Sequence, residues 1–368
     1  MTTPPIKRFE FCDKLEDWKL FPTCKRKEHP PNCGCLKPFI RTSVLKDWMR
    51  KKEPGSDKAN GVLLFEEIKP IQRHPHPSPS TILESCTIVF GWLVGARNGE
   101  LIQNFYDAGF DDSKLRNPSY TLKGHGSNGT LRTALFKHAE HDPYKYELLI
   151  RNLERSRWEF CPFTLVPNMD NETFGNKLYM PFCRQWSVAE LGGTADVYLA
   201  LIQEEFVSDE PGFKKRLGPW VIDPEYGKVR LQTSQRMNQV TDQTQCYKLA
   251  VKSISGDQLS TYIQERQAFV GIRDKPGMLR CLGFYSFTKQ EHDMNSIHNE
   301  HDDDEHYNIL LEYAEKNLDE LFRQDPPQLA EDIHSQWQDL CHISGAIETL
   351  HDFEHDGARW SGYVGILD

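Results

Sequence analysis

The feature that most constrains this chain is a lysine set within an apolar strand pattern. Residues 247–254 read YKLAVKSI, in which Lys252 has mostly apolar neighbours. Such a segment is typical of a strand that lies against a core, where a charged ammonium is costly unless it meets an opposite charge. The segment therefore predicts a β-strand and requires an acidic partner for Lys252.

A suitable acid lies one element later. Residues 259–272 (LSTYIQERQAFVGI) have the pattern of an amphipathic helix, and Glu265 lies on its apolar face. The other residues of that face are Tyr262, Ala268, Phe269 and Ile272. A lysine on a strand and a glutamate on the next helix can satisfy each other as an ion pair. The alternative is two ordinary surface charges at the edges of their elements.

A pair of glycines precedes another predicted strand. In residues 191–201 (LGGTADVYLAL), Gly192 and Gly193 come shortly before an alternating strand pattern. Glycines without side chains allow a backbone to come close to a phosphate group. A simple turn before the strand is the other interpretation of the same pair.

The segments after the glutamate helix continue the alternation of strands and helices. Residues 279–287 and 307–313 are predicted strands, and the acidic stretch between them is interpreted as a solvated insertion rather than a metal site. A short helix is expected at 318–324. Apolar residues at steps of three and four predict a long amphipathic helix over 331–353. This order of elements indicates an α+β fold.

The first 160 residues are predicted to be mostly helical. Helices are expected at residues 43–52, at residues 81–110 as two short helices broken near Gly95–Gly99, and at residues 131–138. Residues 155–166 are predicted to form a strand, and four prolines within residues 69–80 predict a linker. The expected domains are a Cys- and Pro-rich segment with a linker (1–80), a helical region (81–160) and a third domain (181–368).

Ten cysteines in a chain without an export signal are expected to be mostly reduced thiols. Six are scattered among apolar neighbours and are interpreted as core residues. The others crowd the N-terminus and, with a nearby histidine, are the weak zinc candidates: Cys12, Cys24, His29, Cys33 and Cys35. Zinc sites usually present paired C-x-x-C motifs, and this segment has one C-x-C, so a loop-rich segment is favoured over zinc.

The charge balance bears on the partners. The chain has 44 basic and 54 acidic residues and a net charge of −10, which counts against nucleic acid as a partner. The longest apolar run, Thr87–Val94, is far too short to span a bilayer, and no signal pattern opens the chain. We therefore expect no membrane partner and an intracellular location, cytoplasmic or nuclear.

Several of these motifs together resemble a known family. In order, they are the glycine pair with its strand, the lysine strand, the glutamate helix, two strands and the long helix. This order resembles the small lobe and early large lobe of a eukaryotic-type protein kinase, over roughly residues 181–353. The phrases WEFCPFTL, GGTADVYLAL and LLEYAEKNLDEL are similar to a filamentous-fungal group with a helical N-terminal extension. The resemblance implies an antiparallel sheet plus one helix, then the start of a helical large lobe.

The resemblance also implies a site for ATP with magnesium, and serine/threonine kinase activity on an unknown protein substrate. Gly192 and Gly193 would belong to the loop that covers the phosphates. Lys252 would bind the α- and β-phosphates and would be held in place by Glu265.

The adenine would lie between the sheet and the segment that follows its last strand. By the resemblance, Val197 and Ala250 would enclose the adenine, and Leu311 would be the gatekeeper beside it. The backbone of Glu312 and Ala314 would hydrogen-bond to the adenine edge.

The sequence departs from the family pattern in two places. The glycine loop is two residues shorter than the family's, and Ala195 stands in place of its third glycine. No His-Arg-Asp-type loop and no Asp-Phe-Gly occurs, and Asp368 is the only acid near the expected place. The chain is therefore expected to stop before the catalytic loop, as a truncated or misjoined product or as a kinase-like module without chemistry.

Three functions stay open at this point. The chain is a protein kinase family member, or it is a catalytically silent kinase-like module that binds a nucleotide or a partner protein. In the third, the N-terminal region is the functional part and acts as an interaction domain. We further expect apolar residues of the 331–353 helix to be exposed, unless residues 81–110 fold back and cover them.

Overall fold

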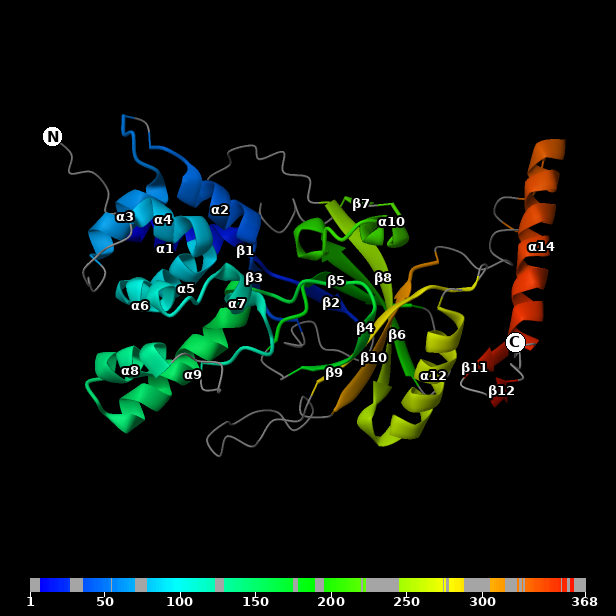
Figure 1. Ribbon diagram of the computed structural model, residues 1–368. Coiled ribbons are helices and arrows are strands. Elements are labelled where there is room, and N and C mark those ends of the chain that lie inside the picture. The colour runs from blue at the N-terminus through cyan, green and yellow to red at the C-terminus, as the bar shows by residue number, and fades with distance from the viewer. Residues whose placement is uncertain are drawn as a thin grey trace.

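The structure is a computed structural model, and it consists of a helical unit, a β-sheet unit and a separate C-terminal helix (Figure 1). The described residues are 7–26, 36–53, 55–69, 78–122, 129–174, 178–188, 195–219, 221–222, 245–273, 275, 278–287, 305–314, 323, 326, 328–351, 353–355 and 358–360.

The helical unit is built around one apolar helix, α5 (Thr87–Gly95). Its sequence TIVFGWLVG is apolar on all sides, and a helix of that kind must be buried. The surrounding helices are α1 (Lys7–Trp18), α2 (Thr42–Arg50), α3 (Asn60–Ile68), α4 (Pro79–Ser85), α6 (Ile102–Asp107), α7 (Asp112–Arg116), α8 (Gly129–His138) and α9 (Pro143–Phe160), with a 3₁₀ turn at Gly99–Leu101. Together they enclose one hydrophobic core, to which helices from both sides of position 80 contribute.

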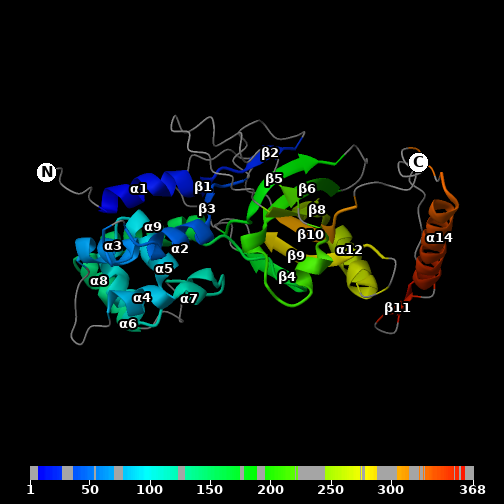
Figure 2. The same ribbon diagram turned by 90° about the horizontal axis from the view of Figure 1, so that it is seen from above.

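The β-sheet lies beside the helical unit (Figure 2). Its strands in spatial order are β2 (Thr23–Lys25), β5 (Phe182–Ser187), β6 (Ala195–Gln203), β8 (Gln245–Ser255), β10 (His306–Glu312), β9 (Cys281–Phe287) and β4 (Met169–Phe174), with β7 (Val221–Ile222) paired to β8. The five central strands are antiparallel to one another. Short two-stranded pairs elsewhere are β1 (Lys19–Leu20) with β3 (Phe39–Ile40), and β11 (Phe353–His355) with β12 (Ala358–Trp360).

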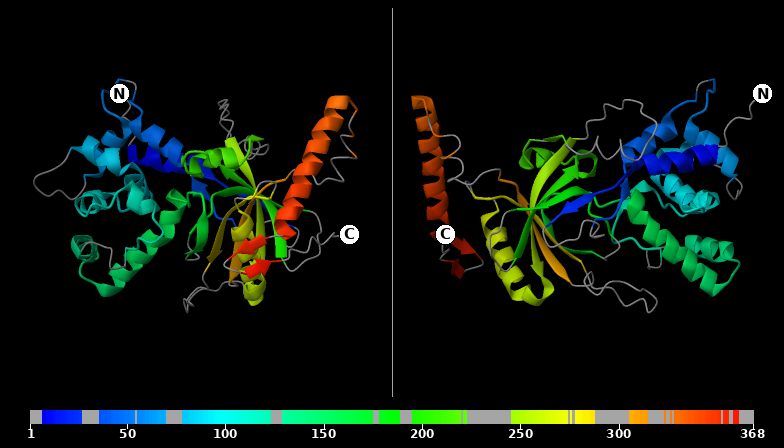
Figure 3. Two further views of the ribbon diagram at one scale, coloured as in Figure 1. Left: turned by 45° about the vertical axis from the view of Figure 1, so that its right-hand side comes forward. Right: turned by 180° about the vertical axis from the view of Figure 1, so that it is seen from behind.

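The two faces of this sheet carry different cores. One face packs with Trp158 of α9 and with Leu20 and Phe39 of the β1–β3 pair, so it faces the helical unit. The other face packs against α12 (Leu259–Ile272), which lies on the far side of the sheet from the helical unit (Figures 1 and 3). The central strands therefore have a partner layer on each side.

Several predicted elements are confirmed. The glutamate helix is α12 with the same bounds, and the helix over 331–353 is α14 (Ala330–His351). The strands around Val197, Lys252 and Leu311 are β6, β8 and β10. Most of the short helix expected at 318–324 and most of the linker at 69–80 lie outside the described residues.

The strand predicted over residues 155–166 is wrong. Residues 155–160 are the last turns of α9, and Leu165 makes only an isolated bridge to Val207. The aromatic residues of this segment favour a strand locally. The buried residues Ile150, Leu153, Arg157 and Phe160 nevertheless follow one another at steps of three and four, and packing against the helical core decides the outcome.

The resemblance implied an antiparallel sheet, but the sheet of this structure is mixed. Two edge strands run parallel to their neighbours, β2 beside β5 and β4 beside β9. Both come from before residue 181, the expected start of the third domain. They belong to the chain as it leaves α1 and α9, so the helical unit supplies both outer strands of the sheet.

The C-terminal helix α14 stands apart from the sheet beyond α12 (Figures 1 and 2). Its apolar residues Ile333, Trp337, Leu340 and Ile347 are all exposed, Trp337 to 63%. The expectation of an exposed apolar stripe is confirmed, and Trp337 and Leu340 are not buried against residues 81–110. In the described part of the chain, no helix is both long enough and apolar enough to cross a membrane.

Candidate functional site

The strand register places four of the predicted site residues on one face of the sheet. Val197 of β6 lies opposite Lys252 of β8, and Leu311 of β10 lies opposite Ala250 of β8. Cross-strand partners point to the same face of a sheet, as do residues two apart on one strand. The face that they share is the one covered by α12, because Ala250 and Leu311 belong to the core beneath that helix.

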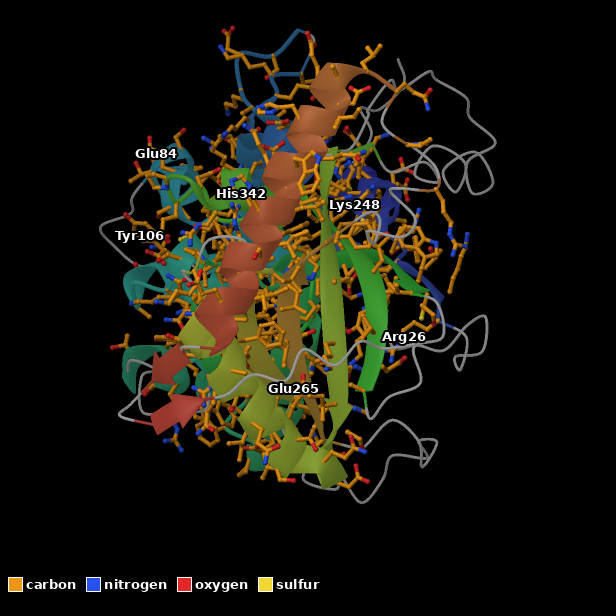
Figure 4. The ribbon with its side chains drawn as sticks, turned by 90° about the vertical axis from the view of Figure 1, so that its right-hand side faces the viewer. Arg26, Glu84, Tyr106, Lys248, Glu265 and His342 are labelled. Atoms are coloured by element: carbon orange, nitrogen blue, oxygen red, sulfur yellow. The ribbon has the colours of Figure 1, made fainter. Side chains whose placement is uncertain are left out.

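The predicted ion pair between the lysine strand and the glutamate helix is present. Lys252 Nζ donates to Glu265 Oε1 at 2.6 Å, and the two side chains are 26% and 23% exposed. Figure 4 shows Glu265 on α12, close to the sheet. The second carboxylate oxygen, Oε2, is buried and accepts no hydrogen bond from the described residues. An ammonium has three donors, so Lys252 retains N–H groups for a further acceptor.

Aromatic stacking holds α12 in the position that this pair needs. Tyr262 of α12 stacks on Tyr307 of β10, with ring centroids 4.6 Å apart and an interplanar angle of 21°. Burial raises the pKa of Tyr262 to about 12, although the nearby Arg266 opposes that shift. The ring is therefore neutral at pH 7, and it fixes the helix one turn before Glu265.

The sheet face is less covered beyond the ion pair. Val197 and Ala250 are half-buried, whereas Ile254 and Ile309 beneath α12 are fully buried. Leu311 is 6% exposed. The face thus passes from a covered part under α12, through the Lys252 cation, to a partly open apolar surface. A flat ring could rest on that surface with an anionic group beside Lys252.

At the end of β10, the backbone N–H of Glu312 is already hydrogen-bonded within the protein. The Glu312 N–H donates to the Arg280 carbonyl at 3.0 Å, and the Arg280 N–H donates to Glu312 Oε1 at 2.9 Å. A contact from the Glu312 backbone to a ligand would therefore have to use the carbonyl oxygen. Ala314 is exposed two residues further along.

Other predicted site residues are not brought together by the described structure. Gly192 and Gly193 lie outside the described residues, as do His29, Cys33 and Cys35 of the zinc candidates. Cys12 is exposed on α1 and Cys24 is half-buried on β2. Within the described ranges, no three His, Cys, Asp or Glu side chains gather as a metal site would require.

Sequence reasoning missed one charged residue near the start of β6. Arg26, which follows β2, forms an ion pair with Asp196 and lies over the Tyr198 ring at 4.3 Å from its centroid. Burial opposes the charge of Arg26, but Tyr198 and Asp196 outweigh it and raise the pKa of Arg26. The two partners are 170 residues apart in sequence, so no local pattern could have revealed the pair.

No protein-family model matches this chain, and no curated protein shows significant sequence similarity to it.

Proposed function

We propose that this chain binds ATP with magnesium on the α12 side of the sheet, as a member of the protein kinase family. The observation that carries the proposal is the Lys252–Glu265 ion pair, formed between the central strand β8 and the helix α12. A lysine held by a glutamate, with donors left over, is suited to bind the oxygens of a polyphosphate.

The surroundings of this pair support the same proposal. The central strand order β5–β6–β8–β10–β9, with α12 between β8 and β9 in sequence, agrees with the antiparallel sheet and single helix that the resemblance implies. Val197, Ala250 and Leu311 supply an apolar surface of the kind that a purine ring needs. Magnesium would arrive with the phosphates, whose charge it neutralises, and we assign it no protein ligand.

For this 368-residue chain we favour ATP binding without phosphoryl transfer. No His-Arg-Asp-type loop and no Asp-Phe-Gly occurs in the 368 residues, and these motifs carry the catalytic base and the metal-holding groups. We expect radiolabel transfer from ATP to a generic protein substrate to stay at background. Magnesium-dependent turnover that disappears in Lys252→Met would instead establish Ser/Thr kinase activity.

Equilibrium binding of a fluorescent ATP analogue, with displacement by ATP, tests the binding itself. We expect Lys252→Met to weaken ATP binding about 10- to 100-fold, since a hydrogen bond to a charged group contributes about 1.5–3 kcal/mol. Glu265→Gln should weaken ATP binding less, because the protein keeps the Lys252 ammonium group and loses only its ionic partner.

The helical unit offers a matched control for this experiment. Lys19 pairs with Glu159 at 2.9 Å, and the two side chains are 21% and 25% exposed, close to the values for Lys252 and Glu265. Lys19 also pairs with Glu16 at 2.6 Å, so Lys19→Met removes both ion pairs of a lysine outside the proposed site and should leave ATP affinity unchanged. Equal ATP affinity in Lys252→Met and in the unmodified chain would refute the proposal.

A further inference from the structure

A cavity of about 990 Å³ lies at the end of the sheet where β9 begins and β10 ends. Its described walls come from α10 (Phe213–Arg216) and Gly212, from Arg273, Lys275 and residues 278–282, and from Asn168 and Glu312. The volume is at the upper end of the range for small-molecule sites. Four parts of the chain that are distant in sequence therefore form one concave surface.

The lining of this cavity is strongly basic. It contains five cationic side chains, Lys215, Arg216, Arg273, Lys275 and Arg280, and one acidic side chain, Glu312. The whole chain carries a net charge of −10, so such a concentration of positive charge runs against its composition. Converging cations in a concave site attract and hold anions.

Most of these cations lack a carboxylate partner. The structure gives Lys215, Arg216 and Lys275 no ion pair within the described ranges, although Lys214 beside them pairs with both Glu204 and Asp209. Glu312, the one acid of the described lining, pairs with Arg280: it accepts a hydrogen bond from the Arg280 backbone N–H, and its Oε2 lies 3.9 Å from Arg280 Nε. Three of the five cations are therefore left without a carboxylate in the described structure, whereas Arg273 and Arg280 each have one.

Arg273 adds a cation that the fold holds in place. Its Nη1 donates to Asp170 at 3.1 Å, and the guanidinium lies 5.6 Å from the centroid of the Phe284 ring. The Nε and Nη2 atoms are buried and donate to no acceptor in the described part of the chain. A guanidinium fixed in this way contributes a constant positive field to the cavity.

The cavity is distinct from the proposed nucleotide face. Of the described residues assigned to the nucleotide, only Glu312 lines the cavity, and Lys252, Glu265 and Leu311 do not. The cavity lies at the end of the sheet and touches both faces, since Cys281 belongs to the core under α12 and Leu282 to the core on the helical-unit side. The cavity also has apolar walls, from Phe213, Met278, Leu279 and Leu282, so its ligand has room for a non-ionic body beside its charges.

We propose that this cavity binds a soluble small molecule that carries two or more phosphate groups. Lysine and arginine are the side chains best suited to phosphate oxygens, arginine through paired N–H donors and lysine as a point charge. Five cations from separate segments exceed what a single phosphate group would engage. The proposal concerns a site other than that of Lys252, and so goes beyond the proposed function.

Isothermal titration calorimetry on the full chain tests this proposal, with inositol hexakisphosphate and inorganic triphosphate as probes. We expect the double variant Lys215→Gln/Arg216→Gln to bind both probes at least about tenfold more weakly. Lys214→Gln is the control, because it removes one positive charge from the same short helix but outside the cavity lining. It should change the affinity less than about twofold, and rising salt should weaken binding to the unmodified chain.

The outcomes separate this site from the nucleotide site and from other anions. Lys252→Met should leave inositol hexakisphosphate binding intact, so the two proposals can fail independently. No binding of either probe, or equal affinity in the double variant with an unchanged thermal melt, would overturn the proposal. So would equal affinity for a glutamate-rich peptide, or binding only to vesicles that contain a phosphoinositide, since either places the ligand in another class.

Discussion

At the scale of single residues, the most constrained side chain of the helical unit is Arg157. It is 1% exposed and donates to the backbone carbonyls of Leu115, Tyr120, Lys114 and Asn117. Burial lowers the pKa of Arg157, and Glu154 at 3.6 Å opposes that shift. One side chain of α9 thus binds both the end of α7 and the residues that follow it.

We expect Arg157→Met to lower the free energy of unfolding by about 3 kcal/mol or more, because it leaves several buried carbonyls without donors. Chemical denaturation monitored by circular dichroism measures the change. Arg155→Met on the same helix is the control, since Arg155 is exposed and should matter by less than about 0.5 kcal/mol. A similar loss in both variants would contradict the role assigned to Arg157.

The buried thiols give a prediction that rests on pKa. Burial raises the pKa of Cys86 to about 11 and that of Cys161 to about 12, whereas Cys12 and Cys341 are exposed. Alkylation requires the thiolate, so at pH 8 iodoacetamide should modify Cys12 and Cys341 in the native protein and leave Cys86 and Cys161 unmodified. Peptide mass spectrometry reads the sites, and denatured protein should be modified at all four. Fast native labelling of Cys161 would show that the helical core opens readily.

At the scale of elements, α5 is apolar on all sides, whereas α14 mixes apolar residues with many polar and charged ones. Both carry apolar residues, but Trp337 of α14 is 63% exposed and Trp92 of α5 is fully buried. Trp92 Nε1 also donates a hydrogen bond to Ser156 Oγ at 3.0 Å. The difference lies in what surrounds each helix in the described structure, because a side chain is stabilised by burial only where other side chains meet it.

We expect Trp337→Ser to change the free energy of unfolding by less than about 0.5 kcal/mol, since little surface is buried there. Trp92→Ala, by contrast, should cost about 3–5 kcal/mol through lost contacts and the cavity left behind. Sedimentation velocity should also show less self-association in Trp337→Ser, because the exposed stripe on α14 is reduced. A large loss of stability in that variant would mean that Trp337 is buried in solution.

At the scale of the whole molecule, Glu205 connects the two units. It follows β6, and its Oε2 accepts from the Ser43 N–H at the start of α2 at 2.8 Å, while Arg41 lies 3.6 Å from its Oε1. A carboxylate at a helix N-terminus is favourable because the free N–H groups and the helix dipole both attract it. The sheet unit in this way caps a helix of the helical unit.

We expect Glu205→Ala to weaken this connection and to destabilise α2 by about 0.5–2 kcal/mol, the cost of losing a helix cap. Differential scanning calorimetry should then show the unfolding transition broadening or splitting into two, one for each core. Glu210→Ala is a control, as an exposed acid near the same segment. A single sharp transition with an unchanged midpoint in Glu205→Ala would show that other contacts couple the units.

Local patterns in the sequence were enough to determine the central part of this protein. The strand around Lys252, the helix with Glu265 and their ion pair follow from periodicity and from the cost of burying an unpaired charge, both of which are properties of short segments. The resemblance to protein kinases adds a role for this pair, and that role stays a proposal. The order of the strands β6, β8, β9 and β10 and of the helices α12 and α14 was likewise readable from one segment to the next.

Only the tertiary structure decided the features that join distant segments. The parallel edge strands β2 and β4, the Arg26–Asp196 pair, the carbonyls around Arg157 and the basic cavity all unite residues far apart in the chain. The same holds for residues 155–160, whose strand-like composition gave way to the helix that packs on the core. A short window of sequence records local conformational preference and the need for burial, but not which distant group will meet that need.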